Sequence, residues 1–381
     1  MSANFVSNGQ DLDEIFVLIS ELNDLIGNSS LYTCGHNHYG QLGLSDLTDR
    51  SSPTQVSSTT NWREVSAGHA QNAAIKADGT FWAWGENQQG QLGLGDTLNR
   101  INPVQVGTLN NYAKVSSGTN ITCIIKTDGT LWTCGYNGAP GSLGIGGGPS
   151  KSSPVQVGTL TNWKEVSAGN YHGSSIKTDG TLWTWGYNAY GNLGLGDLTN
   201  RSSPVQVGAL TDWKDISSKY FHSAAIKTDG SLWVWGYNLY GQLGLGDDNS
   251  GTDRSSPVQV GTLTNWKQIS TSYSHTMAVK TDGTLWAWGY GLYKQLGLGD
   301  IVSRSSPVQV GTLTNWKHVS AGYYHSLAVK TDGTLWAWGY DAYGNLGFGD
   351  TIDRFSPVQV GSLSDWKSAS AGNLFSAALR F

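Results

Sequence analysis

Four histidines recur at one position of a pattern that returns about every 50 residues: His172, His222, His275 and His325. A neutral imidazole can act as a general base or ligate a metal ion, so a ring of these side chains could hold a metal if the fold gathered them. A metal site needs its nitrogen ligands within about 2.0–2.1 Å of one ion, whereas each histidine belongs to a different copy of the pattern. Other copies carry Gln71, Ile121 or Phe375 instead. These replacements favour packing or a loop hydrogen bond, and we expect no metal.

Pairs of acidic and basic residues also recur, four to seven residues apart: Asp46 with Arg50, Asp96 with Arg100, Asp197 with Arg201, Asp247 with Arg254, Asp300 with Arg304, and Asp350 with Arg354. A general acid–base couple serves one reaction centre and would not be copied six times. The repeated Gly-x-Gly strings lack the strand–helix context and the lysine of a phosphate-binding loop. The sequence therefore predicts ion pairs that bridge loops, no enzymatic activity and no cofactor.

Tryptophan is abundant, with 17 residues in a chain of 381, and it falls on three positions of the same pattern. One copy places them at Trp316, Trp336 and Trp338. Large rings at a fixed period are typical of side chains that fill the space between repeated units. The cysteines Cys34, Cys123 and Cys134 are too few and too unevenly spaced for a disulfide framework or a zinc site. We expect them to be buried thiols.

The elements that must position these residues are short strands. The pentapeptide LWAWG and its variants occur seven times, from 31–35 to 335–339, and the motif S/N-P-x-Q-V occurs seven times as well. In the sixth unit, runs at 308–310, 316–320, 326–330 and 335–339 predict four strands. Four short antiparallel strands per unit of about 50 residues are typical of a propeller blade. We therefore predict an all-β fold, a seven-bladed β-propeller of four-stranded blades.

The termini are predicted to close this ring. The repeats begin with a lone fourth strand at 31–35 and end with a lone third strand at 376–380, and their pairing would complete the seventh blade. A recurring Asp-Gly, such as Asp128–Gly129, favours a two-residue type I′ turn between these two strands. That turn would place Cys123 opposite Cys134 in the second unit. The same register places Ala377 opposite Cys34 in the closing blade.

The strings DGTLWAWG, YNxYGQLGLGD and RSSPVQVG carry a family resemblance. Residues 31–381 resemble the regulator of chromosome condensation repeat family, which implies a seven-bladed β-propeller and protein–protein recognition on a rigid ring, but no single activity. Relatives include a Ran GTPase exchange factor, a plant UV-B photoreceptor and a bacterial β-lactamase inhibitor. The photoreceptor's tryptophans cluster with arginines, whereas this chain is poor in arginine and its tryptophans lie inside predicted strands. We therefore do not expect photosensing.

One face of the predicted ring is rich in aromatic residues. Segments before the third strand and after the fourth must lie opposite the Asp-Gly turns, and over four of the seven blades they carry tyrosines. Tyrosine is favoured at interfaces because it offers a large rigid area and a polar tip, although these rings could instead pack on neighbouring loops. The predicted protein-binding face comprises Tyr171, Tyr190, Tyr220, Phe221, Tyr240, Tyr273, Tyr293, Lys294, Tyr323, Tyr324 and Tyr343.

Residues 1–30 lie outside the repeat, and they carry five acidic residues and no basic one. Apolar residues at 12, 15, 19, 22 and 26 predict an amphipathic helix over residues 11–26. A closed propeller does not need this helix for its core, so it either packs on the ring or docks on a larger assembly. The predicted docking segment comprises Phe5, Leu12, Ile15, Phe16, Ile19, Leu22 and Ile26. The chain is thus divided into a docking segment, 1–30, and a propeller, 31–381.

Charge bounds the class of partner. The 28 acidic residues less those five leave 23 after residue 30, against 23 basic ones, and this balance does not favour nucleic acid. No apolar run is long enough to insert in a membrane, and no basic segment of a secretory signal precedes residue 30. We expect a non-enzymatic structural or protein-binding propeller, anchored in a multi-subunit assembly such as a phage virion and located in a virion or a cytoplasm. The alternatives are a stand-alone bacterial interaction or inhibitor module and, less favoured, a GTPase exchange factor.

Overall fold

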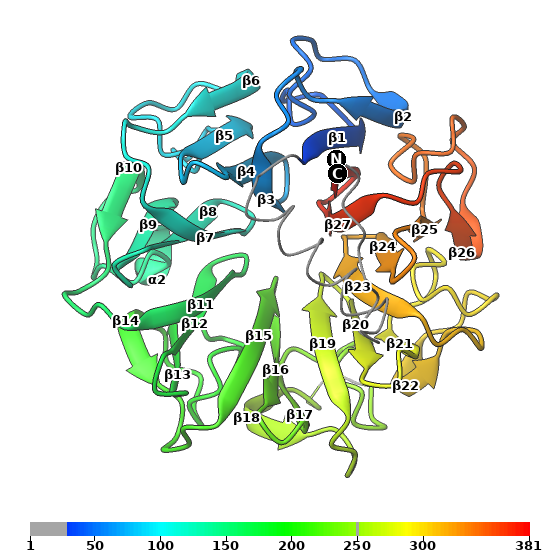
Figure 1. Cartoon of the computed structure of the whole chain (residues 1–381). Helices are drawn as coiled ribbons and strands as arrows, with labels where there is room; N and C mark the ends of the chain where they lie inside the picture. The colour runs from blue at the N-terminus through cyan, green and yellow to red at the C-terminus, as the bar shows by residue number, and fades with distance from the viewer. Residues whose placement is uncertain (1–28, 249–250) are drawn as a thin grey trace, which may run out of the picture.

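Short strands dominate the computed structural model, which describes residues 29–248 and 251–381. In this part of the chain, 28 strands form seven antiparallel sheets of four strands each. Figure 1 shows the sheets arranged around a central axis like the blades of a propeller. The predicted fold class is confirmed for the ring. The predicted helix at 11–26 lies outside the described residues.

Each blade places its strands in order from the axis to the rim (Figure 1). The innermost strands are β3 (Trp62–Ala67), β7 (Tyr112–Ser117), β11 (Trp163–Ala168), β15 (Trp213–Lys219), β19 (Trp266–Thr271), β23 (Trp316–Ala321) and β27 (Trp366–Ala371). The second strands are β4 (Gln71–Lys76), β8 (Ile121–Lys126), β12 (His172–Lys177), β16 (His222–Lys227), β20 (His275–Lys280), β24 (His325–Lys330) and β28 (Phe375–Arg380). The third strands are β5 (Phe81–Gly85), β9 (Leu131–Gly135), β13 (Leu182–Gly186), β17 (Leu232–Gly236), β21 (Leu285–Gly289), β25 (Leu335–Gly339) and β1 (Ser30–Gly35). The outer strands are β6 (Arg100–Gln105), β10 (Lys151–Gln156), β14 (Arg201–Gln206), β18 (Arg254–Gln259), β22 (Arg304–Gln309), β26 (Arg354–Gln359) and β2 (Arg50–Gln55).

The grouping of strands into blades differs from the sequence prediction by one strand. The run at 308–310, expected to begin the sixth blade, lies at the end of β22, which pairs with β21 of the preceding blade. The sequence prediction assigned the run at 308–310 to the blade that follows it because only a short loop separates the two. In the structure a long loop joins β21 to β22 within one blade, and the short loop crosses to the next blade. The proline of each outer strand fits this position, since an edge strand tolerates a residue that cannot donate a hydrogen bond.

The Asp-Gly turns are not of the predicted two-residue type. Lys126 N donates to Thr130 O at 3.0 Å and Gly129 N donates to Lys126 O at 2.9 Å, so three residues form the loop. Gly129 has a positive φ of 74° whereas Asp128 does not, which identifies a type I turn followed by a glycine bulge. Asp128 favours this form because its Oδ1 accepts hydrogen bonds from Thr130 N and Oγ1. The longer loop shifts the register by one residue.

The ring closes between β1 and β28, as predicted, in this shifted register. Cys34 lies opposite Ser376, and Ala377 lies opposite Thr33 rather than Cys34. The same correction applies to Cys123, which faces Thr133. The split blade therefore keeps the register of the continuous blades, although no turn joins its two strands. Strands from the two ends of the propeller domain thus form one sheet, ordered β2-β1-β28-β27.

A ring of serine hydroxyls joins the innermost strands. In each blade a serine Oγ accepts a hydrogen bond of 2.8–3.0 Å from a backbone N–H of the next blade, including Ser370 to Ala67 across the closure. Each inner strand has an open edge whose donors would otherwise lack partners. The apolar cores lie between neighbouring blades: Leu31 and Leu379 of the closing blade pack with Trp62 and Trp84 of the next.

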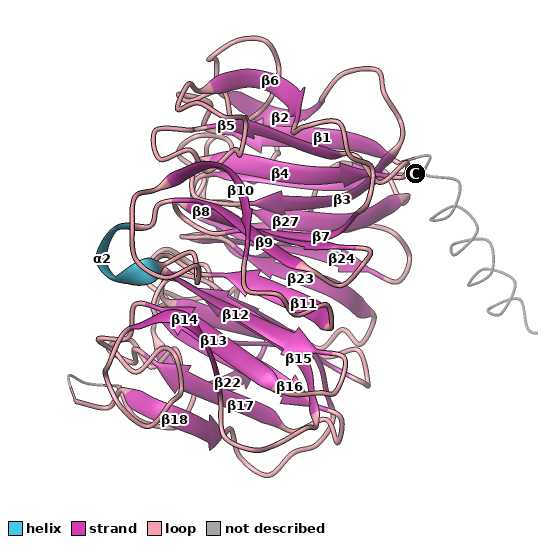
Figure 2. Cartoon of the chain, turned by 90° about the vertical axis from the view of Figure 1, so that its left-hand side faces the viewer, coloured by secondary structure: helices cyan, strands magenta, loops and turns pink. Residues whose placement is uncertain are grey.

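The ring has two different faces. The Asp-Gly turns and the described chain ends, Ser29 and Phe381, form one face, where Ser29 O accepts from Trp62 N just as Gly79 O accepts from Tyr112 N. We call this the turn face. The segments that follow the third strands, including the short helix α2 (Gly138–Gly141), form the opposite one, the loop face. Figure 2 shows the C-terminus and α2 on opposite sides of the ring.

Candidate protein-binding surface

The recurring histidines join neighbouring blades and do not converge on one point. All four are fully buried at the start of a second strand. Each Nε2 lies near a hydroxyl of the next blade: His172 near Ser223 at 3.5 Å, His222 near Thr276 at 2.9 Å, His275 near Ser326 at 3.0 Å, and His325 near Ser376 at 3.0 Å. Burial lowers the pKa of His172 to about 4 and the pKa of the other three to about 3. They are neutral parts of the packing at physiological pH.

Other groups that could do chemistry are also built into the packing. Residues 29–248 and 251–381 contain no group of three or more His, Cys, Asp or Glu side chains that could hold a metal ion. The three cysteines are buried and free. Burial raises the pKa of Cys134 to about 12 and also raises the pKa values of Cys34 and Cys123. Buried thiols of this kind do not supply a reactive thiolate.

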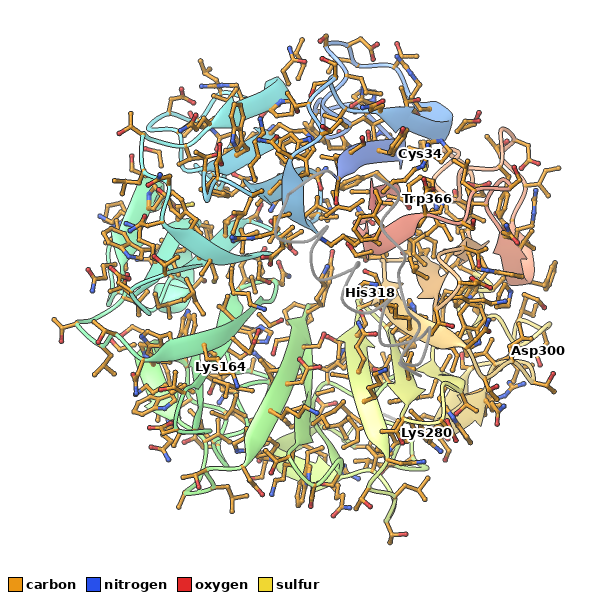
Figure 3. All side chains as sticks on the ribbon, in the orientation of Figure 1. Cys34, Lys164, Lys280, Asp300, His318 and Trp366 are labelled. Carbon is orange, nitrogen blue, oxygen red and sulfur yellow. The ribbon has the colours of Figure 1, made fainter. Side chains whose placement is uncertain are left out.

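The six acid–base pairs bridge loops at the rim, as predicted. Their carboxylate and guanidinium groups lie within 2.8 Å of each other. Figure 3 shows Asp300 at the outer edge of the ring, far from His318 on an inner strand near the axis. Such half-exposed pairs add little stability individually. They fix the loops that follow the third strands.

The tryptophans of the third strands pack between blades, as expected from their period. Trp84, Trp235, Trp288 and Trp338 are fully buried, and each indole N–H donates to a carbonyl of the preceding blade at 2.9–3.0 Å. A second row of tryptophans holds lysines that the sequence analysis overlooked. The ammonium groups of Lys76, Lys126, Lys177, Lys227, Lys280 and Lys330 lie 3.6–4.4 Å from the indole ring centroids. These desolvated cation–π contacts contribute about 2 kcal/mol each.

Aromatic side chains form a continuous row of ring contacts on the loop face, which we call the aromatic arc. Successive ring centroids lie 4.2–6.5 Å apart. The arc comprises Tyr136, Tyr171, Tyr187, Tyr190, Phe221, Tyr237, Tyr240, Tyr290, Tyr293, Tyr324 and Tyr340. Every member is partly exposed. Burial raises the pKa of Tyr237 to about 12, so its hydroxyl stays uncharged. The packing and binding interpretations are therefore compatible: each ring supports its neighbour and still presents an edge to solvent.

Three further predicted tyrosines lie closer to the axis. Tyr220, Tyr273 and Tyr323 contact one another with centroid distances of 4.2–5.1 Å, and we call them the axial tyrosines. Tyr323 touches Tyr324 at 4.3 Å and Tyr220 touches Phe221 at 6.0 Å. These contacts join the axial tyrosines to the aromatic arc, so nine of the eleven predicted face residues lie in one cluster.

The remaining two lie apart from this cluster. Lys294 forms an ion pair of 2.7 Å with Asp353 and lies 4.6 Å from the Phe355 ring, so its charge holds the next loop in place. Tyr343 contacts His36 at 4.8 Å, near the closing blade. The predicted face thus has a compact centre and two peripheral members.

Two apolar residues complete the centre of the arc and were missed by the sequence analysis. Leu239 and Leu292 are 38% and 53% exposed, and each directly precedes an arc tyrosine, Tyr240 or Tyr293. The equivalent positions hold Ala189 and Ala342. A leucine at a loop position that is alanine in other copies was the available signal.

The predicted docking segment cannot be placed relative to this surface. Phe5, Leu12, Ile15, Phe16, Ile19, Leu22 and Ile26 lie outside the described residues. The first described residue, Ser29, lies on the turn face, opposite the aromatic arc. In the described part of the chain, no helix has the length and apolar character needed to cross a membrane.

Comparison with known proteins places this ring in context. The family model for the RCC1-like domain matches residues 30–378. The chain matches no curated protein by sequence. Human WBSCR16 has a structure with a TM-score of 0.82 at 20% identity, covering 92% of this chain and 98% of that one.

Two structures of a yeast protein are similar as well. Prp20p of Saccharomyces cerevisiae, described with its binding to Gsp1p and histones, gives a TM-score of 0.81 at 20% identity over 94% of both chains. Yeast RCC1 (Prp20) bound to Kap60 gives 0.82 at 19% identity, over 100% of this chain and 94% of that one. At such identities the likeness establishes the fold alone.

Proposed function

The chain belongs to the RCC1-like domain family, and from that premise we propose that it is a non-enzymatic propeller whose protein partner docks on the loop face. RCC1-like propellers serve as protein-binding modules, and Prp20p is described with the protein partners Gsp1p, histones and Kap60. The observation that carries the proposal is the aromatic arc. It supplies a contiguous, partly exposed and uncharged surface on one side of a rigid ring.

The physical properties of the arc suit an interface core. The centres of protein interfaces are depleted in charged residues and enriched in tyrosine. Tyrosine is favoured because binding must fix only two torsions of its side chain. Here neighbouring rings already restrain those torsions: Tyr293 contacts Tyr290, Tyr324 and Tyr340. Leu239 and Leu292 add exposed apolar area between the rings. A preorganised surface loses little conformational entropy when a partner binds.

The setting of this module belongs to the same proposal. The ring is a component of a larger particle, such as a phage virion, or of a cytoplasmic assembly, and residues 1–30 anchor it there. Ser29 leads into the ring on the turn face, so an anchor on that side leaves the aromatic arc accessible. The rival setting is a stand-alone interaction or inhibitor module, in which residues 1–30 are dispensable.

The test compares matched substitutions on the two faces. The partner is first captured from the native source by crosslinking and purified. Tyr240→Ala, Leu292→Ala and Tyr293→Ala are expected to weaken its binding at least ten-fold, since truncated aromatic anchors typically cost 2 kcal/mol or more, about 30-fold. Leu160→Ala, Leu263→Ala and Leu313→Ala remove leucines of similar exposure, 45–48%, from loops of the turn face.

These control substitutions are expected to change the affinity less than two-fold. The opposite pattern, with binding lost only in the turn-face variants, would refute the assignment of the loop face. Accelerated nucleotide release from a captured small GTPase would instead favour the exchange-factor alternative.

A further inference from the structure

A small pocket lies at the axis of the ring on the loop face, and residues of all seven blades line it. Its walls come from the ends of the innermost strands and the residues that follow them. Lys219 is the only lysine or arginine in that lining, and none of the lining residues is a carboxylate. The axial tyrosines Tyr220, Tyr273 and Tyr323 form one side of the pocket. Figure 1 shows the end of β15, which carries Lys219, pointing to the axis.

Among the described residues, Lys219 has an incomplete set of hydrogen-bond partners. Its Nζ donates a hydrogen bond of 3.2 Å to the carbonyl of Ala67, which belongs to β3 of another blade. An ammonium group has three donors, and a carbonyl offers no countercharge. Other lysines of this ring have a carboxylate as countercharge: Lys114 pairs with Glu165 and Lys294 with Asp353. Burial lowers the pKa of Lys219 to about 8, and no carboxylate opposes this shift.

The lysine also departs from the repeat at a cost to the backbone. The equivalent position is glycine in five blades, at 68, 118, 169, 322 and 372, and serine at 272. In the blade of Lys219 the inner strand runs one residue further, so that Lys219 pairs with His222. The next residue, Tyr220, then adopts a positive φ of 52°. This conformation is unfavourable for a residue with a side chain, so the local structure is strained where it places the cation at the axis.

We infer that this pocket binds a monocarboxylate, whose oxygens accept hydrogen bonds from the free donors of Lys219. The cavity measures about 30 Å³, against the roughly 10–15 Å³ that one water needs, so two carboxylate oxygens fit while the rest of the ligand extends to the loop face. A single ammonium neutralises a monoanion. A dianion such as phosphate would keep an uncompensated buried charge.

Two kinds of ligand present a carboxylate of this kind. The inference does not depend on the proposed function. A free small carboxylate and an aspartate or glutamate side chain of a docked protein present the same group. The axial tyrosines form one side of the pocket, and the low polarity of their rings strengthens an ion pair beside them. Both sources are therefore tested as ligands.

The measurement is an NMR titration of the full chain labelled with ¹³C at lysine Cε. Burial lowers the pKa of His69 and of His325 and raises the pKa of Tyr220 and of Tyr323, so these four groups near Lys219 stay uncharged between pH 7 and 9. At constant ionic strength, acetate is expected to shift the Lys219 signal saturably. Saturation should raise the pKa of Lys219 by about one unit, which corresponds to ten-fold tighter binding to the protonated form.

Variants identify the signal and test the role of the charge. Lys219→Met should abolish the acetate response and Lys219→Arg should retain it. Lys214→Met is the matched control, because Lys214 is exposed on the same strand and its removal should leave the response intact. If Lys219→Met does not fold, the titration of the unmodified chain with and without acetate still decides. Absence of a saturable shift at 100 mM acetate would overturn the inference.

Two further ligands complete the test. Inorganic phosphate is expected to bind at least ten-fold more weakly than acetate, and equal or tighter phosphate binding would contradict a monocarboxylate site. A blocked pentapeptide with one central aspartate distinguishes the sources. Peptide binding tighter than acetate identifies a protein carboxylate as the ligand, and binding weaker than acetate identifies a free one.

Discussion

Asp341 offers a sharp test of how the loops of the loop face are built. Five other units place an asparagine here: Asn37, Asn87, Asn137, Asn188 and Asn238. In Asn188, Oδ1 accepts a hydrogen bond from Leu193 N, and Nδ2 donates to the carbonyls of Asp197 and Thr199 at 2.9 and 3.1 Å. Asp341 Oδ1 accepts from Leu346 N at 2.8 Å in the same way. Its Oδ2 is fully buried and has no hydrogen-bond partner in the part of the chain that the structure describes.

The physical consequence is a carboxyl that must hold a proton. An ionised Oδ2 at the site of an amide donor would face carbonyl oxygens, and only the protonated form can donate to them. Burial raises the pKa of Asp341 to about 7, with Asp350 and Asp353 raising it and Arg354 and the Leu346 N–H opposing them. A negative charge on Asp341 also raises the pKa of the Cys34 thiol. Because the pKa is higher in the folded than in the unfolded chain, where it is near 3.9, stability is lost as the pH rises from about 4 through 7.

The magnitude follows from the same shift. Three pKa units correspond to about 4 kcal/mol at full ionisation, so we expect Asp341→Asn to stabilise the fold by roughly 2–4 kcal/mol at pH 8. With an unfolding entropy of about 2.1 cal/mol/K per residue, this raises Tm by roughly 3–5 °C. At pH 4 the variant and the parent should melt within about 1 °C of each other. Thermal unfolding followed by circular dichroism across this pH range measures the difference.

The matched control is the reverse change in another blade. Asn188→Asp should lower Tm at pH 8 and introduce the same pH dependence, because its amide donates to two carbonyls. A destabilising Asp341→Asn would show that Asp341 is stabilised as a carboxylate. A Tm difference that does not change with pH would show that folding does not shift the pKa of Asp341. Either result would refute the reasoning.

The other predictions concern the ring itself. Burial lowers the pKa values of His222, His275 and His325 to about 3, so the stability of the fold should decrease as the pH drops from 6.5 towards 4. His325→Phe copies Phe375, which the closing blade carries at this position, and should make stability depend less steeply on pH in acid unfolding. An unchanged pH dependence would contradict this prediction. Deleting 373–381 removes β28, which pairs with both β27 and β1, and should cause aggregation or a large fall in Tm. A chain starting at Ser30 loses the bond from Trp62 N to Ser29 O but keeps every strand, so its Tm should fall far less; equal losses would contradict the closure. Ser370→Ala leaves Ala67 N without its partner across the closure and should cost about 1–3 kcal/mol in denaturant unfolding. Ser368→Ala on the same strand is the control and should cost under about 0.5 kcal/mol.

Much of the fold could be predicted because the same pattern of strands recurs in seven repeats. The period, the Asp-Gly turns and the lone terminal strands defined the blades and their closure. The type of turn was wrong, since the side chain of Asp128 stabilises a three-residue loop that the dipeptide alone does not reveal. The serine ring was not predicted because each hydroxyl bonds to an inner strand of the next blade, 51 to 54 residues away in six blades and 303 residues away for Ser370.

The candidate site could be predicted only in part. Loop tyrosines such as Tyr240 and Tyr293 were identified because hairpin geometry assigns them to one face, and their mutual contacts follow from the ring. Lys219 and Asp341 were missed, although each departs from its repeat at a single position. The effect of such a departure depends on the residues that surround it in the fold. A lysine in an exposed loop is common, whereas Lys219 places a cation in the pocket at the axis of the ring.

Hydrogen–deuterium exchange of the full chain with and without its purified partner tests the central claim most directly. The claim is that a protein docks on the aromatic arc. The partner should slow exchange in the loops at 236–243 and 289–296, which carry Tyr237, Tyr240, Tyr290 and Tyr293, and should leave the turn-face loops at 158–162 and 261–265 unchanged. Protection confined to the turn-face loops, with the arc loops exchanging as in the free chain, would contradict the account.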